Sequence, residues 1–416
     1  LSANFTVQKA RNISRYLPLR TFNPALVKWL QSAFLSGEVQ SGNAVLKGPL
    51  NAFPFPNGEG TFLISGDVKN IDLFYAAGWP QLNRANGKLT FSGSGMQVDI
   101  AQAKIFDIPV KNVTGEIQNL ADPQLKIQSS EITTDFAQGL KFINASPLKE
   151  TIGRMFTGMS ASGPVTLKLG LAIPLADPAK AQVQGKVVMK NAQLELVPWR
   201  LKLDKLNGQF SFTENTTEAE NIEGLLFNKP IRIDLKTIQK SANDSVVRAS
   251  LSGDLYVSDL ESWLKIPFSK VAEGSASVKT DIDFAANEPI EIHLRTNLVG
   301  ITLDLPDQYG KKAQQERNLT ADIEVRENQP LRIQLSYGDL LGAALILNRQ
   351  QETFDLTAAN LQLGTGTPDW PPGSGLYITG NFDQLDWDKI KGYMGQNGGV
   401  NIANLVLRKI DIRAKT

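Results

Sequence analysis

The sequence predicts an all-β protein with a few short helices, built as a repeating antiparallel sheet. Apolar and polar residues alternate with a period of two through most of the 416 residues, which is typical of strands that bury one face. Asn, Asp, Gly and Pro interrupt these runs at short intervals, and long helical patterns are scarce. A group of short motifs also recurs at one fixed spacing, which indicates stacked structural repeats.

The clearest alternating run lies near residue 170. Its apolar side chains share one face of the predicted strand, and polar or small residues occupy the other face. Comparable sets predict further strands with one buried face. The sets are Val165-Leu167-Leu169-Leu171-Ile173, Ile231-Ile233-Leu235, Ile290-Ile292-Leu294, Ile301-Leu303-Leu305, Leu319-Ala321-Ile323-Val325 and Leu331-Ile333-Leu335.

The repeat is visible in three motifs that each return 121 residues later. Lys69-Asn70 returns as Lys190-Asn191, Gly87-Lys88-Leu89-Thr90-Phe91 as Gly208-Gln209-Phe210-Ser211-Phe212, and Pro109-Val110 as Pro230-Ile231. Trp79 and Trp199 fall within one residue of the same spacing. An offset that holds over some forty residues indicates a repeated structural unit with several strands in each copy.

A short predicted helix marks the start of each unit. Asn23-Pro24 and Ser146-Pro147 have the N-cap residue followed by proline at the first helical position, and Ser258-Asp259 begins a capping-box pattern. A fourth helix is expected around Asp386. The predicted divisions are a leading segment at residues 1–22, repeat units at 23–145, 146–257 and 258–375, and the start of a fourth unit at 376–416. The Gly- and Pro-rich stretch 364–375 is the candidate hinge or linker.

Composition excludes several classes of function. Lys and Arg total 43 against 42 Asp and Glu, without a dense basic stripe, so we expect no nucleic-acid partner. Cysteine is absent, which excludes disulfides, Cys-ligated metals and thiol catalysis. The longest apolar stretch, residues 340–347, is far shorter than the roughly 20 residues that span a bilayer. Because the chain begins at Leu1 without a signal-like segment, we expect a piece of a longer protein.

Several segments resemble the central region of AsmA-like proteins of the YhdP type, which are related to AsmA and TamB. The segments are Arg15-Tyr16-Leu17-Pro18, Trp29-Leu30, Phe53-Pro54-Phe55, Gly78-Trp79-Pro80, Ser146-Pro147-Leu148 and Gly373-Ser374-Gly375-Leu376. The resemblance covers nearly the whole chain. It implies a curled antiparallel sheet, a β-taco, that encloses an elongated groove. It also implies the periplasmic portion of a protein anchored in the inner membrane of a Gram-negative bacterium.

The resemblance further implies a lipid-transfer role. The chain would shield phospholipid acyl chains between the inner and outer membranes, with membranes at the ends of the full-length protein and with no cofactor. Protein partners are not predicted. The residues expected to line the groove are the in-phase apolar sets Val165, Leu167, Leu169, Leu171, Leu194, Leu196, Phe210, Phe212, Ile231, Ile233, Ile301 and Leu303.

Alternation by itself leaves other interpretations open. The same apolar residues would form the sealed core of a β-sandwich, and the protein would then be a structural or scaffold repeat of the cell envelope. A carbohydrate-active enzyme is a third interpretation, resting on paired acids such as Asp281 and Asp283. We expect no catalytic site, since those acids and the single histidine, His293, fall on a polar strand face, and a lone histidine without cysteine predicts no metal site.

Overall fold

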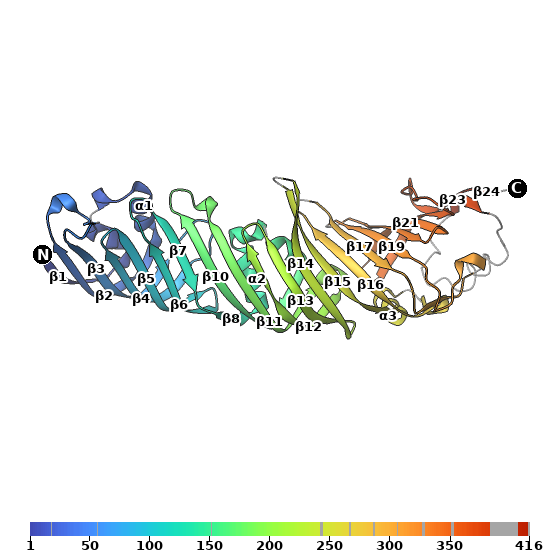
Figure 1. The fold of residues 1–416 in the computed structure, drawn as a ribbon, viewed down its shortest axis with the longest axis horizontal. Helices are drawn as coiled ribbons and strands as arrows, with labels where there is room; N and C mark the ends of the chain where they lie inside the picture. Colours follow the sequence, from blue (N-terminus) through green and yellow to red (C-terminus); the bar gives the residue numbers. More distant parts are fainter. Residues whose placement is uncertain are drawn as a thin grey trace. The chain divides into compact units, whose positions relative to one another are not determined.

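The computed structural model describes residues 1–17, 19–55, 57–150, 152–241, 244–265, 268–285, 288–305, 307–326, 329–350, 353–382 and 407–414. The chain forms two compact units, Leu1–Glu220 and Asn221–Thr416. Both are mostly β (Figure 1). The predicted class, an all-β protein with short helices and an antiparallel sheet, is confirmed. In each unit the sheet is open and not strongly curled, which corrects the expectation of a curled β-taco.

Most strands of the first unit pair with a neighbour in the chain. They are β1 (Ser2–Val7), β2 (Phe34–Lys47), β3 (Thr61–Leu73), β4 (Leu82–Ser92), β5 (Gly95–Ile105), β6 (Ile108–Ile117), β7 (Gln124–Ser129), β8 (Ile132–Asp135), β9 (Met159–Ser162), β10 (Pro164–Pro174), β11 (Gln182–Leu196) and β12 (Leu201–Thr213). β10 pairs with both β7 and β8, because residues 130–131 interrupt the strand opposite it. β13 (Thr217–Leu226) contains the boundary between the units.

The second unit continues the same pattern up to β22. Its strands are β14 (Lys229–Ser241), β15 (Asp244–Tyr256), β16 (Ala272–Phe284), β17 (Ile290–Thr296), β18 (Ile301–Leu303), β19 (Leu319–Val325), β20 (Leu331–Tyr337), β21 (Leu341–Gln350), β22 (Thr353–Leu363), β23 (Gly375–Phe382) and β24 (Leu407–Ala414). The pairs β22–β23 and β23–β24 are parallel, whereas β14 to β17 and β19 to β22 pair antiparallel with their neighbours.

Helix α1 (Pro24–Ala33) begins where the sequence predicted. The Asn23 Oδ1 accepts a hydrogen bond from the Ala25 N–H at 2.8 Å, and Pro24 occupies the first helical position, where it loses no helical hydrogen bond. Three residues, Leu26, Leu30 and Ala33, are almost fully buried along one side of the helix. Burial of this apolar side explains why so short a helix is stable.

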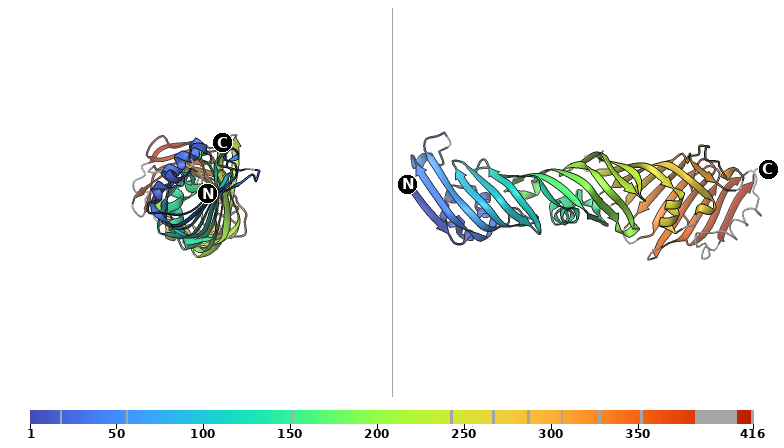
Figure 2. Two further views of the ribbon diagram at one scale, coloured as in Figure 1. Left: turned by 90° about the vertical axis from the view of Figure 1, so that its left-hand side faces the viewer. Right: turned by 90° about the horizontal axis from the view of Figure 1, so that it is seen from below.

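The second predicted helix start, at Ser146-Pro147, is confirmed only as a 3₁₀ turn, in which the Ser146 Oγ accepts a hydrogen bond from the Leu148 N–H at 3.3 Å. Helix α2 (Phe136–Asn144) begins before Ser146, because the Asp135 Oδ1 accepts from the Ala137 N–H at 2.9 Å and caps it. Pro147 opens only a short 3₁₀ helix, Pro147–Glu150. Figure 2 shows α2 to one side of the strands around it. Helix α3 (Val257–Leu264) starts one residue before the predicted Ser258 and lacks a side-chain cap. The fourth predicted helix, around Asp386, lies outside the described residues.

The 121-residue repeat has a structural basis in the backbone. The β3–β4 register shifts at Val68, Ile71 and Leu73, and the β11–β12 register shifts at the positions 121 residues later, Met189, Ala192 and Leu194. Positive φ angles also recur at this spacing, in Asn70 and Asn191, Arg84 and Lys205, and Phe106 and Phe227. The repeated motifs therefore encode matching β-bulges, which bend the strand and increase its twist.

A glycine with a similar backbone conformation occurs in each of the three predicted units. Each glycine has a φ between 93° and 111°, and a Cβ there would lie 2.1 to 3.1 Å from a backbone oxygen of the neighbouring strand or turn. Only glycine fits such an approach without strain. The three pairs are Gly37 with Asn70, Gly163 with Asn191 and Gly274 with Gly300. The boundaries of the predicted repeat units remain a prediction.

The segment 364–375, predicted as a hinge or linker, is the crossover that joins the parallel strands β22 and β23. It packs against the sheet. The Gln334 Nε2 donates to the Pro368 carbonyl at 2.8 Å, the Asn360 Nδ2 donates to the Asp369 carbonyl at 2.9 Å, and the Arg332 guanidinium lies 4.1 Å from the centre of the Trp370 ring. These contacts fix the crossover to one face of β20–β22.

Candidate functional site

The second unit has two rows of apolar residues that cross its strands from β14 to β22. Antiparallel register places the members of each row directly opposite one another, on one face of the sheet. The first row is Leu235, Ala249, Ile282, Ile292, Ile323, Ile333, Leu345 and Ala359; the second is Ile233, Leu251, Thr280, Leu294, Ala321, Leu335, Ala343 and Leu361. We call these two rows the apolar face.

The apolar face is incompletely covered. Ile292, Ile323 and Ile333 each have a bonded strand on both sides, yet all three are half-buried. An isoleucine beneath a second protein layer would be fully buried, as core residues usually are. The middle of this face is therefore only partly shielded from solvent by the chain itself.

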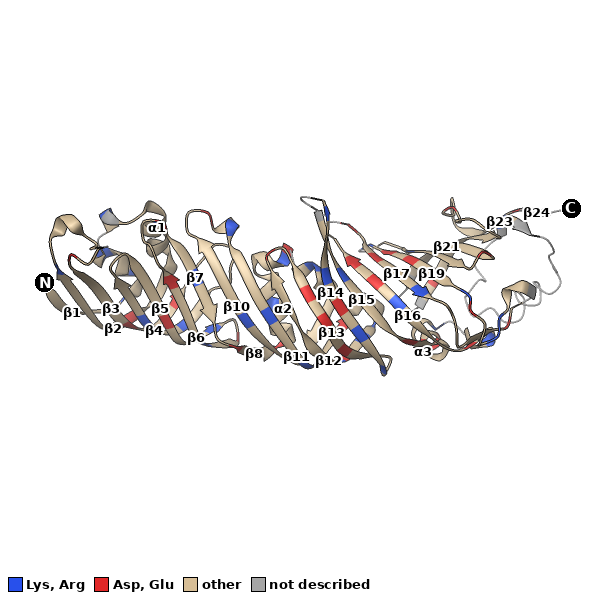
Figure 3. Ribbon diagram, viewed as in Figure 1, with Lys and Arg blue, Asp and Glu red and all other residues tan. Residues whose placement is uncertain are grey.

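The opposite face of the same strands is charged. Figure 3 shows acidic and basic residues along β14 to β19. Arg248 on β15 holds Asp283 on β16 with two hydrogen bonds of 2.7 Å, and Arg295 lies 3.3 Å from Asp281. Charge on one face and isoleucine on the other indicate that water contacts the first and that something apolar is needed to cover the second.

Asp283, Glu291 and His293 lie close enough together to resemble a metal site. However, both Asp283 oxygens accept hydrogen bonds from Arg248, and these bonds hold the pKa of Asp283 below its usual value. The His293 Nδ1 lies 2.6 Å from an Asp322 oxygen instead. A guanidinium beside a carboxylate disfavours a cation there, so the group fits an ion-pair network.

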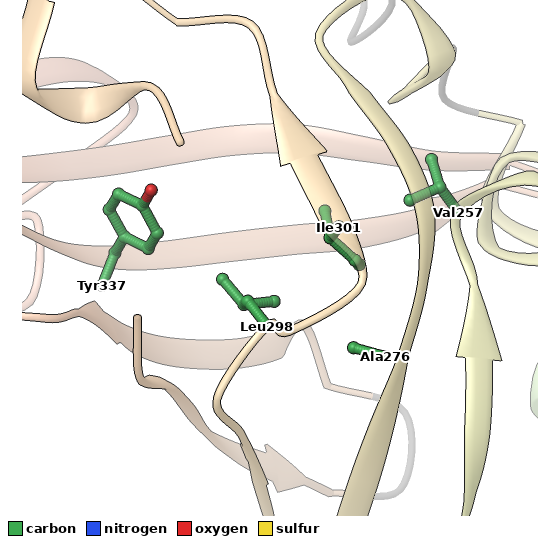
Figure 4. Close-up of a cluster of buried hydrophobic side chains, with 5 residues drawn as sticks. All are labelled: Val257, Ala276, Leu298, Ile301 and Tyr337. Carbon is green, nitrogen blue, oxygen red and sulfur yellow. The ribbon is translucent and has the colours of Figure 1, made fainter. Parts of the chain in front are cut away.

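One edge of the apolar face is sealed. Val257 of α3, Ala276 of β16, Leu298, Ile301 and Tyr337 form a buried cluster, with Leu319 and Leu341 packed against it (Figure 4). Residues 297–318, between β17 and β19, supply Leu298 and Ile301 to it. The open part of the face therefore begins where this cluster ends.

Around Phe91 the first unit differs, because the apolar residues there are covered by other parts of the chain. Phe91, Met96 and Ile117 are cross-strand neighbours with 1%, 3% and 0% of their surface exposed. The Phe22 ring, just before α1, stacks on Phe91 with 6.2 Å between ring centroids. Here the helical segment supplies a second layer.

The predicted lining residues fall into two groups. Five are half-buried, namely Leu167, Leu169, Leu194, Leu196 and Leu303. Seven are buried, namely Val165, Leu171, Phe210, Phe212, Ile231, Ile233 and Ile301. The register sets Leu167 in one row with Val187 and Phe210, whereas Ile301 belongs to the sealed cluster under α3. Their role in lining a groove stays a prediction.

The half-buried isoleucines of the apolar face were not among the predicted lining residues. Ile292, Ile323 and Ile333 belong to alternating sets that the sequence shows clearly, but alternation does not reveal which sets lack a cover. Cross-strand register was the missing information, since it alone places the three side chains in one row.

Within the described residues, no helix combines the length and the apolar character needed to cross a membrane. No solved structure matches the chain. A relative, the intermembrane phospholipid transporter YhdP of Escherichia coli (strain K12), is 24% identical over 302 residues, which cover 72% of this chain and 24% of the relative. The chain thus spans about a quarter of that protein. The family model described as YhdP protein matches residues 1–416, and the chain therefore belongs to the YhdP protein family.

Proposed function

We propose that this chain is a lipid-transfer segment that shields phospholipid acyl chains on its apolar face between two membranes. The observation that carries the proposal is the half-buried isoleucine row of β17, β19 and β20, which has bonded strands on both sides but an incompletely covered face. The relative's description as an intermembrane phospholipid transporter supports the same substrate.

Acyl chains suit this surface on energetic grounds. Each methylene that leaves water contributes about 0.8 kcal/mol, and aliphatic side chains in a row offer contact without a specific polar partner. The polar head group would stay in water at the edge of the face. Such a surface binds lipids by their tails and lets them move along it, because successive positions on the face are chemically alike.

The resemblance in sequence supports a location for this activity. We propose that the chain acts in the periplasm, as part of a protein anchored in the inner membrane of a Gram-negative bacterium, and carries lipid in an elongated groove. Within the first unit, we propose the same role for the predicted lining residues, Leu167 and Leu169 among them.

Native mass spectrometry of the chain purified from bacteria tests the proposal. The expected result is protein that carries bound phospholipid, which organic extraction removes and which rebinds on addition of phospholipid. Protein that is free of lipid as purified, and that takes up none afterwards, would contradict it.

The rival interpretation is a structural envelope repeat with a sealed core. The first unit favours it locally, since Phe91 and Ile117 are almost fully buried beneath other segments of the chain. The two interpretations differ at the apolar face of the second unit. Lipid bound there supports transfer, and a stable lipid-free protein leaves only the structural role.

A further inference from the structure

Two cations lie side by side at the sealed edge of the apolar face, on residues 297–318. The Lys311 side chain is buried, with only 4% of the residue exposed, and its Nζ donates to the carbonyl oxygens of Leu298, at 2.8 Å, and Ile301. Arg317 is half-buried, and its guanidinium lies over the Tyr337 ring, 5.1 Å from the ring centre. Burial lowers the pKa of Lys311, and the charge of Arg317 lowers it further.

No described carboxylate pairs with either cation. Among the described side chains, neither Lys311 nor Arg317 has an acidic group within 4.0 Å, although basic residues elsewhere on this unit, such as Arg248 and Arg295, are paired with aspartates. Buried and half-buried charges are ordinarily paired, since desolvation without a counter-charge is costly. Within the part of the chain that the structure describes, this edge of the apolar face therefore carries two positive charges without a paired carboxylate.

The guanidinium of Arg317 also has unused donors. Its Nη1 donates to the carbonyl of Gln308 at 2.7 Å and to the Tyr337 hydroxyl at 3.1 Å, which anchor the side chain. Its Nε and Nη2 make no hydrogen bond to any described residue. An anchored guanidinium with two parallel free N–H groups matches the geometry of two oxygens on one phosphorus.

The cations and the apolar face are adjacent. Tyr337 lies beneath Arg317 and belongs to the buried cluster of Figure 4. Leu335, two residues before it on β20, belongs to the second row and is half-buried. A molecule held at Arg317 therefore has half-buried apolar side chains next to it. This juxtaposition of anion donors and aliphatic surface fits an amphiphile with a negatively charged head.

We propose that Arg317, with Lys311 behind it, binds the phosphate of a phospholipid head group whose acyl chains lie on the apolar face. The proposal rests on the proposed lipid-transfer function and adds a head-group site to it. Arg317 makes the direct contact. Lys311 is a positioning residue, which fixes the 297–318 segment through two carbonyls and adds a positive charge.

A competition experiment separates the head-group site from binding by the tails alone. The delipidated full chain is incubated with equal amounts of phosphatidylglycerol and diacylglycerol that have identical acyl chains, and native mass spectrometry measures the ratio of the two complexes. A charge-assisted bidentate contact predicts about a tenfold preference for the lipid that carries phosphate. Arg317→Gln should reduce the ratio toward one, and Arg317→Lys should restore part of it.

Lys312→Gln is the matched control, because Lys312 is an exposed cation on the same segment; the ratio should not change. Equal binding of both lipids by the unmodified chain would overturn the head-group site and leave the proposed function intact, whereas binding of neither lipid would contradict the proposed function itself. Excess inorganic phosphate distinguishes the source of the anion. Abolition of the preference by phosphate alone would assign the site to free phosphate and overturn the lipid assignment.

Discussion

Replacing Ile323 with glutamate gives the sharpest contrast between an open and a sealed apolar face. Ile323 lies on β19 between Ile292 and Ile333, in the middle of the first row, and is half-buried. If the face is open, water reaches the new carboxylate and keeps it ionised. The cost to folding is then the lost burial of an aliphatic side chain, about 1–2 kcal/mol.

A sealed face predicts a much larger effect. An unpaired carboxylate beneath a second layer would cost about 3–5 kcal/mol, enough to unfold a marginally stable region. On an open face the substitution has a larger effect on lipid binding than on folding, because a carboxylate there excludes the methylenes of an acyl chain. Exclusion of about four methylenes weakens binding by about 3 kcal/mol, or roughly two orders of magnitude in affinity.

Hydrogen exchange and lipid binding are measured on the same samples. We expect Ile323→Glu to keep the amide protection of β19 and β20 and to lose bound phospholipid. Thr320→Glu is the control, since Thr320 is on the same strand but on the opposite, charged face. This variant should keep both the amide protection and the bound phospholipid. If Ile323→Glu lost the amide protection of β19 and β20 while Thr320→Glu kept it, the apolar face would be sealed and the proposed lipid surface would be wrong.

Three further changes test the account. Ile117→Ala, at a site with 0% exposure, should destabilise the first unit by about 2–5 kcal/mol, because it leaves a cavity in a covered core. Ile323→Ala, at a half-buried site, should destabilise the second unit clearly less, as measured by local hydrogen exchange. Equal destabilisation would show that Ile323 is covered as completely as Ile117. Gly163→Ala, with φ +93° and a backbone oxygen 3.1 Å from the new Cβ, should lower the melting temperature, whereas Gly139→Ala, in α2 with no atom within 4 Å, should leave it equal or higher. Two hydrogen bonds from its arginine partner lower the pKa of Asp283, so this pair stabilises the fold above about pH 4 and loses that contribution as the pH falls through the lowered pKa. Asp283→Asn should therefore flatten the acid side of a pH series of urea denaturations, and an unchanged slope would show that the pair contributes little.

The repeat and the strands could be predicted because they depend on local patterns. Lys69-Asn70 and Lys190-Asn191 recur because both asparagines take a positive φ at a bulge, and each asparagine N–H donates to a side-chain oxygen of another asparagine, Asn86 or Asn207, at 2.9 Å. Asn tolerates this conformation better than most residues, so the structural requirement leaves a visible motif.

The helix positions and the cover of the sheet could not be predicted as well. Ser146-Pro147 has the residue types of a helix start, but Asp135 caps α2 eleven residues earlier, and both patterns are permitted by local rules. Whether a second layer of the chain covers a strand face depends on contacts between distant segments, such as the contact of Phe22 with Phe91. Alternation in Ile290-Ile292-Leu294 is the same whether or not a second layer lies above it.

Photo-crosslinking at two adjacent residues of β17 can show whether phospholipid lies on the apolar face. Ile292 is on the apolar face, and Glu291 is exposed on the charged face of the same strand. A photoreactive amino acid is placed at one position or the other in protein expressed in bacteria, and covalently attached lipid is identified by mass spectrometry. Because acyl chains would contact only the apolar face, we expect phospholipid adducts at position 292 and none at position 291. Absence of adducts at 292, or equal labelling at both positions, would contradict it.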